Sequence, residues 1–169
     1  DKNPETFFNT LFQLDSDGID FRLAVLGENF KKSPSIFNQA QEKLNKKIIH
    51  FGYCESYKEY LDLIKKSNIL PVTSFQDFFG ISIVEAVSYG NYPILPDRLS
   101  YPELFDYNNN SDLFYKDESE LKNKLINVIN NIENIKDRLN NLSGYVFEKY
   151  SWTTMSKKYD LDFIELASN

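Results

Sequence analysis

The sequence reads ILPVTSFQDFFGISIVEA over residues 69–86, and this segment decides the fold. Residues 69–73 predict a strand, in which Pro71 is better placed near a strand end or at a sheet edge. A loop ending at Gly80 follows, and the apolar spacing after it predicts a helix up to Tyr89 that Gly90 closes. A strand, a loop and a helix in this order form one unit of an α/β fold.

The same alternation extends in both directions from this segment. Further strands are expected at residues 21–26, 48–51, 92–96 and 112–115. Helices are expected at residues 4–17 and 34–44, after the possible N-cap Ser56, and over most of the chain from Asp117 to its end. The pattern predicts one α/β domain over residues 1–169, a Rossmann-like parallel sheet with helices on both faces. Such sheets bind ligands beyond the carboxyl ends of their strands.

Composition narrows the class of protein. A chain of 169 residues with 41% hydrophobic and 26% charged residues is typical of one globular domain. A net charge of −6 argues against a nucleic-acid-binding surface on this part of the protein. The single cysteine excludes an internal disulfide and fits a reducing compartment, so we expect a cytoplasmic protein. No apolar run reaches the length of a transmembrane helix, and no signal peptide is recognisable.

The first residues suggest that the sequence is part of a longer protein. It begins without Met at Asp1, and Asn3 and Pro4 already read as an N-cap and the first position of a helix. We therefore expect an excised domain whose preceding part is missing.

Residues 77–85 are the best candidate for a ligand site. The backbone amides of Phe79, Gly80 and Ile81 are expected to be unpaired donors at a helix start, where a diphosphate binds well. Asp77 could face the sugar end of such a ligand, and Glu85 a ribose diol. In the alternative interpretation Asp77 is only an N-cap and Glu85 only a solvated helix residue. Spacing alone favours this alternative.

The residues around this segment favour the ligand site over the alternative. Seven residues separate Asp77 from Glu85, and Phe-Gly follows the first acid. This arrangement resembles the donor motif of the retaining GT-B glycosyltransferases of family 4 (group 1), in which the first acid is usually Glu. The blocks DKNPETFF, VLGENF, HFGY, DFFG, GNYP, YPE and SW, which begin at residues 1, 25, 50, 77, 90, 101 and 151, also follow the order seen in that family. They are most similar to the branch of mannosyltransferases that modify queuosine in tRNA.

The resemblance implies a role for each matching residue. Asp77 holds hydroxyls of the donor sugar, and Lys2 neutralises the diphosphate, together with an arginine that lies upstream in the family. The donor loop Asp77-Phe78-Phe79-Gly80, continued by Ile81, presents its amides to the phosphate. Gly27 allows a close approach of the phosphates, Tyr53 packs on the nucleobase and Glu85 binds the ribose. Without the family, Lys2 is a solvated chain end, Gly27 simply ends a strand, and Tyr53 packs at a rim.

No metal site is expected from the sequence. We find no cluster of His, Cys, Asp and Glu with metal-ligand spacing, and we assign Cys54 no partner for metal binding or nucleophilic work. His50, the only histidine, is interpreted as a buried, hydrogen-bonded residue at the end of an apolar strand and not as a base. In GT-B enzymes basic side chains and helix amides stabilise the leaving diphosphate, so no metal cofactor is required.

The function implied is that of a nucleotide-sugar-binding domain in a retaining glycosyltransferase. The donor implied is GDP-mannose, and tRNA queuosine is the acceptor, bound by a missing N-terminal domain. The helix from about Trp152, with Trp152 as its anchor, is expected to cross toward that domain, and the isolated fragment should be inactive. Three alternatives remain: a family 4 transferase for lipid-linked or cell-wall glycans, a GT-B nucleotide-sugar epimerase, and a non-catalytic flavodoxin-like binding module.

Overall fold

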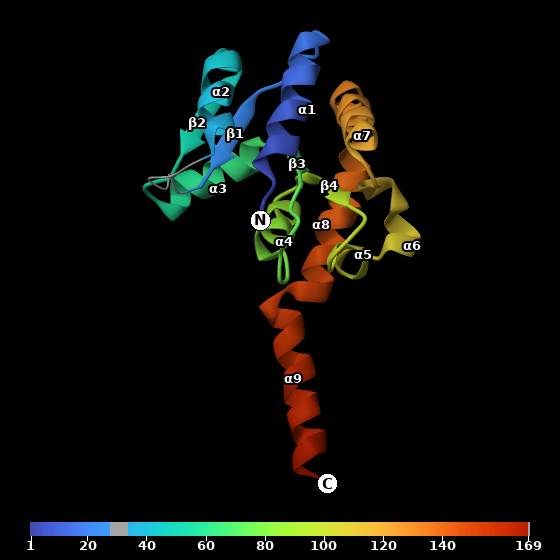
Figure 1. The fold of residues 1–169 in the computed structure, drawn as a ribbon. Coiled ribbons are helices and arrows are strands. Elements are labelled where there is room, and N and C mark those ends of the chain that lie inside the picture. The colour runs from blue at the N-terminus through green and yellow to red at the C-terminus, as the bar shows by residue number, and fades with distance from the viewer. Residues whose placement is uncertain (28–33, 169) are drawn as a thin grey trace.

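Strands and helices alternate along the chain, as expected (Figure 1). The computed structural model describes residues 1–27 and 34–168, so residues 28–30 of the VLGENF block lie outside the described residues. The strands are β1 (Leu23–Leu26), β2 (Ile48–Gly52), β3 (Ile69–Pro71), β4 (Tyr92–Pro96) and β5 (Phe114–Tyr115). The helices are α1 (Pro4–Ser16), α2 (Ser35–Lys43), α3 (Tyr57–Lys66), α4 (Ile81–Ser88), α5 (Tyr101–Leu104), α6 (Tyr107–Asn110), α7 (Glu118–Asn130), α8 (Lys136–Tyr150) and α9 (Trp152–Ala167). Short 3-10 turns occupy Ser111–Leu113 and Ile132–Ile135.

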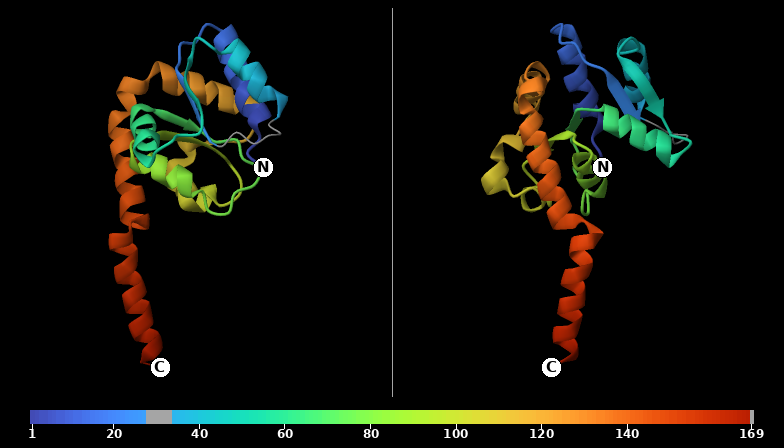
Figure 2. Two further views of the ribbon diagram at one scale, coloured as in Figure 1. Left: turned by 90° about the vertical axis from the view of Figure 1, so that its left-hand side faces the viewer. Right: turned by 180° about the vertical axis from the view of Figure 1, so that it is seen from behind.

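Helices cover both faces of the strands. Figure 2 shows α1, α2 and α7 on one side and α3 and α4 on the other, with α8 packed against α4. Apolar side chains of the helices pack against those of the strands to form the core. Strand β4 is buried along its whole length. The prediction of an α/β domain with a parallel sheet and flanking helices is confirmed.

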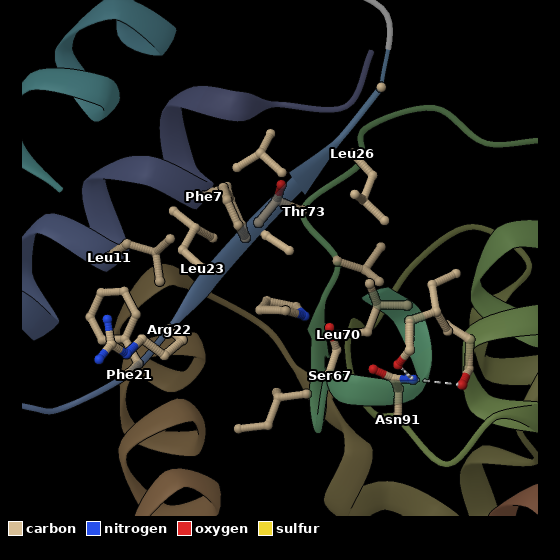
Figure 3. A pocket seen from close by; sticks show the side chains of 18 of the residues that line it. Phe7, Leu11, Phe21, Arg22, Leu23, Leu26, Ser67, Leu70, Thr73 and Asn91 are labelled. Carbon is tan, nitrogen blue, oxygen red and sulfur yellow. Dashed lines mark hydrogen bonds between the residues drawn. The ribbon is translucent and has the colours of Figure 1, made fainter. Parts of the chain in front are cut away.

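The parallel sheet is divided into two parts. In the described chain β1 pairs with β2, and β3, β4 and β5 form a separate three-stranded sheet in that order. Residues of β1 and β3 face each other across a cavity of about 970 Å³ that α1 also lines (Figure 3). Its walls are mostly apolar, with Phe7, Leu11, Leu23 and Leu70 among them. The strand pairing therefore differs from one continuous Rossmann-like sheet.

Element boundaries depart from the sequence prediction mainly where strands are short. The strand expected at residues 21–26 begins at Leu23, where its pairing with β2 starts. In place of the strand expected at 112–115, the structure has a 3-10 turn followed by the two-residue strand Phe114–Tyr115. Of the residues in that expected strand, these two pair with β4. Pro71 is the last residue of an edge strand, as expected, so its missing N–H costs the sheet no hydrogen bond.

Helix α9 extends away from the body of the domain (Figure 1). Ser151 caps its first turn by accepting a hydrogen bond from the amide of Thr154, but none of its residues is buried. Trp152 is 74% exposed and packs only loosely against Tyr159, with ring centroids 6.3 Å apart. Within the described chain Trp152 therefore does not anchor this helix, and its crossing toward another domain stays a prediction. No helix among the described residues is both long enough and apolar enough to cross a membrane.

A truncation tests the independence of α9. Deleting residues 152–169 removes no buried side chain from the described chain, so we expect the free energy of unfolding to change by less than about 1 kcal/mol. Urea denaturation followed by circular dichroism measures it. A loss of several kcal/mol would show that α9 contributes to the core.

Candidate functional site

The carboxyl ends of the parallel strands gather the predicted site residues at one edge. Gly27 follows β1, Tyr53 follows β2, and residues 72–80 connect β3 to α4. The start of α1 is held at this edge, because the Thr73 hydroxyl donates to the carbonyls of Lys2 and Asn3 at 2.9 and 3.0 Å. The site therefore joins the first residues of the chain to the loop after β3.

Asp77 is the centre of this arrangement. Its side chain is only 12% exposed, and the Lys2 ammonium lies 2.8 Å from Oδ2. The Tyr101 hydroxyl donates to the same oxygen at 3.2 Å, and the Gly80 amide donates to Oδ1 at 2.9 Å. Burial alone would raise the pKa of this carboxyl, but the hydrogen bond and charge of Lys2, helped by Tyr101 and Gly80, hold it below its usual value. Asp77 is thus ionised and preorganised.

The start of α4 requires glycine. Gly80 has a φ of +85°, and a Cβ there would lie 3.3 Å from the Tyr101 ring and 3.4 Å from Ile83. Its amide is paired with Asp77, so the prediction of three unpaired amides is wrong for Gly80. Within the described chain, the amides of Phe79 and Ile81 have no acceptor. Two donors of the donor loop therefore remain available to an anion.

The side chains around these amides are open to solvent. Phe78 is fully exposed and Ile81 is 72% exposed, whereas Phe79 makes an edge-to-face contact with Tyr150. An exposed aromatic and an exposed aliphatic side chain flank the two available amides. A bound molecule would cover apolar surface here as well as accept hydrogen bonds.

Glu85 is held by a pair of tyrosines from α3. The hydroxyls of Tyr57 and Tyr60 donate to its two carboxylate oxygens at 2.9 and 2.8 Å, and the rings stack with centroids 5.9 Å apart. The hydrogen bond to Glu85 raises the pKa of Tyr57 to about 12, and burial followed by the same kind of bond raises that of Tyr60. The alternative view of Glu85 as a merely solvated residue is therefore wrong. Each oxygen keeps acceptor capacity for a further donor.

The cavity between the two parts of the sheet brings together some predicted residues and leaves others out. Lys2, Gly27 and Asp77 line it. The other lining residues are mostly apolar, with Arg22, Ser67 and Asn91 among the polar ones (Figure 3). Tyr53 does not line it and is 66% exposed. The predicted residues outside its lining are Tyr53, Phe78, Phe79, Gly80, Ile81 and Glu85.

Four further residues support the site and were not assigned to it from the sequence. Tyr57, Tyr60 and Tyr101 bond the two acids, and Arg98 donates to the carbonyls of Ser74 and Thr73, each at 3.0 Å. The i, i+3 spacing of Tyr57 and Tyr60 placed both on one helix face. Nothing in the sequence indicated that this face meets Glu85.

A second cluster lies beside the tyrosine pair. His50, Cys54 and Glu59 place one ligand atom each within 4.8 Å of the others, so the interpretation that Cys54 has no partner is wrong. Burial and the Glu59 carboxylate raise the pKa of the Cys54 thiol. His50 Nε2 lies 3.3 Å from the Gly52 carbonyl, in agreement with its assignment as a hydrogen-bonded residue.

Comparison with known proteins decides the family. A family model described as "Glycosyl transferases group 1" matches residues 1–143. The chain belongs to this family. A tRNA-queuosine alpha-mannosyltransferase from Drosophila melanogaster is 37% identical over 127 residues. That match covers 75% of this chain and 32% of the Drosophila protein, so the chain spans about a third of the length of this relative.

A pair of glycine substitutions tests the geometry of the donor loop. We expect Gly80→Ala to destabilise the domain by about 1–2 kcal/mol, because of its positive φ and the contact with Tyr101. Gly144→Ala is the control: it lies within α8 with nothing within 4 Å of a new Cβ, so it should stabilise by about 0.5–1 kcal/mol. Urea denaturation measures both, and changes of equal sign would contradict the loop conformation.

The Lys2–Asp77 pair predicts a pH dependence. The pKa of Asp77 is lowered in the folded state, so the stability it contributes is present above the unfolded pKa of about 3.9 and is lost as pH falls through the folded pKa. Because Lys2 is 66% exposed, we expect Asp77→Asn to cost only about 0.5 kcal/mol at pH 7. Denaturation at pH 7 and below pH 4 checks this, and a difference that grows at acid pH would be inconsistent with an ionised Asp77.

Proposed function

We propose that this chain is the nucleotide-sugar-binding domain of a retaining glycosyltransferase. The observation that carries the proposal is the placement of an ionised Asp77 between the Lys2 ammonium and the available amides at the start of α4. Cation, carboxylate and helix-start amides are the groups needed for the diphosphate and the sugar of one donor molecule. Membership of the group 1 family supports the same reading.

Each group has a distinct task in donor binding. Lys2 exchanges its contact with Asp77 for the diphosphate, whose charge it neutralises, and the amides of Phe79 and Ile81 bind phosphate oxygens. Asp77 then accepts hydroxyls of the sugar while the Tyr101 hydroxyl and the Gly80 amide keep it oriented. No metal ion is needed for this charge balance.

Glu85 is positioned for the ribose. Its two oxygens already accept one tyrosine hydroxyl each, and a carboxylate has about four acceptor positions in all. The remaining positions suit the two hydroxyls of a ribose diol. Tyr60, which is half-buried, fixes the carboxylate, and the exposed Tyr57 closes its outer side. Tyr53 and Gly27 complete the proposed site at the nucleobase and the phosphates.

For the substrates we propose GDP-mannose as donor and tRNA queuosine as acceptor. The name of the Drosophila relative supports the acceptor and the sugar, and cytoplasmic action would follow from a tRNA substrate. In the transfer, the bond between the sugar C1 and the diphosphate breaks, an acceptor oxygen bonds to C1, and its proton is released. The acceptor belongs on a preceding N-terminal domain, toward which the exposed apolar side chains of α9 would turn.

Calorimetric titration of this chain with GDP, UDP and GDP-mannose tests the donor site. We expect weak, saturable binding of GDP and GDP-mannose, and no transfer to queuosine tRNA by this chain alone. Glu85→Gln and Tyr60→Phe should each weaken GDP binding, Glu85→Gln by about tenfold, because a charge-assisted hydrogen bond is worth roughly 1.5–3 kcal/mol. Asp62→Asn, on the same helix as Tyr60 but paired with Lys58, is the control.

Three results would count against the proposal. Absence of nucleotide binding would remove the donor site, tighter binding of UDP would reject GDP as its nucleotide, and sugar transfer by this chain alone would contradict the need for a second domain.

A further inference from the structure

The cluster of His50, Cys54 and Glu59 lies outside the proposed donor contacts. His50 is in β2, Cys54 follows the end of that strand, and Glu59 is in the first turn of α3. Their ligand atoms, one from each side chain, all lie within 4.8 Å of one another. An imidazole, a thiol and a carboxylate are the three side chains that bind zinc-like metals in proteins.

The distance between imidazole and sulfur fits a shared metal ion. Cys54 Sγ lies 3.6 Å from His50 Nε2. Bonds of about 2.3 Å from zinc to sulfur and about 2.0–2.1 Å to nitrogen, at a tetrahedral angle, place the two ligand atoms roughly 3.6 Å apart. The two side chains therefore already stand at the separation that one tetrahedral ion requires.

The third side chain of the cluster, Glu59, comes from α3. Glu59 Oε1 lies 3.9 Å from His50 Nδ1, the ring nitrogen other than the one beside Cys54, so this distance alone does not place Glu59 on the ion. Its support is that one ligand atom of each side chain lies within 4.8 Å of the others. Glu59 Oε2 accepts the Glu55 amide at 3.0 Å, and the Ser56 cap fixes the turn that carries it. Within the described chain no Lys or Arg forms an ion pair with Glu59. Glu59 has to change its side-chain conformation to join an ion held by Nε2 and the thiolate.

We propose that His50, Cys54 and Glu59 bind a zinc-class divalent metal ion, with solvent at the fourth position. The ion would connect the carboxyl end of β2 to the first turn of α3. That turn begins at Tyr57 and leads to Tyr60, the two residues that bond Glu85. The ion would hold this turn in place beside the proposed donor site, and the proposed sugar transfer does not require it.

Zinc affinity of tag-free protein, with its thiol reduced, tests the proposal by competition with a chromogenic chelator. We expect one Zn²⁺ per chain. Cys54→Ser and Glu59→Gln should each weaken binding at least about tenfold, because each removes one of three ligands. Asp62→Asn is the matched control, since its carboxylate is on the same helix but pairs with Lys58 at 2.7 Å, and it should bind Zn²⁺ as the unchanged protein does.

Cobalt binding gives a spectroscopic test of whether Cys54 is a metal ligand. Co²⁺ bound to the unchanged protein should give a thiolate-to-cobalt charge-transfer band that Cys54→Ser abolishes and Zn²⁺ displaces. Circular dichroism of each variant confirms that it is folded. Absence of stoichiometric binding, a cobalt band that survives in Cys54→Ser, or an equal loss in Asp62→Asn would overturn the proposal. None of these readouts uses a nucleotide, so they stand apart from the test of the donor site.

Discussion

The ion pair between Lys2 and Asp77 is the contact on which the rest of the site depends. It joins the first residues of the chain to the loop after β3, 75 positions away. The same carboxylate caps the start of α4 through the Gly80 amide and holds Tyr101 of α5. One half-buried charge thus contacts a cation, a helix start and an aromatic ring. Because Lys2 is exposed, this contact can be exchanged for an anionic ligand at low cost.

Two carboxylates of the site are stabilised in different ways, and the difference matches their proposed tasks. Asp77 is balanced by a cation that a diphosphate would remove, so its surroundings change when a ligand binds. Glu85 is balanced by two neutral hydroxyls from α3, which need not move. The proposed site therefore has charge neutralisation at Asp77 and a fixed hydrogen-bond geometry at Glu85. The stability of α3, and hence of its attachment to β2, then matters for Glu85.

Most elements were predictable because their signals are local. Asn3 and Ser56 cap helices as expected, and Asp117 caps the helix that was expected to begin there. Contacts between separate elements were not predictable. The hydroxyls of Tyr57 and Tyr60 bond Glu85 from another helix, and Trp152 is exposed in the described chain. The bond from the Gly80 amide to Asp77 is local, and the alternative interpretation of Asp77 as an N-cap already contained it.

The sequence by itself determined the order of strands and helices and the family to which the chain belongs, since periodicity, caps and ordered blocks are properties of neighbouring residues. The donor role of residues 77–85 stays a proposal. Only the tertiary structure decided which side chains meet. It divided the sheet between β1 and β3, placed Tyr57 and Tyr60 on Glu85, and gathered His50, Cys54 and Glu59. Contacts between separate elements depend on how those elements pack, and the spacing of neighbouring residues does not predict that packing.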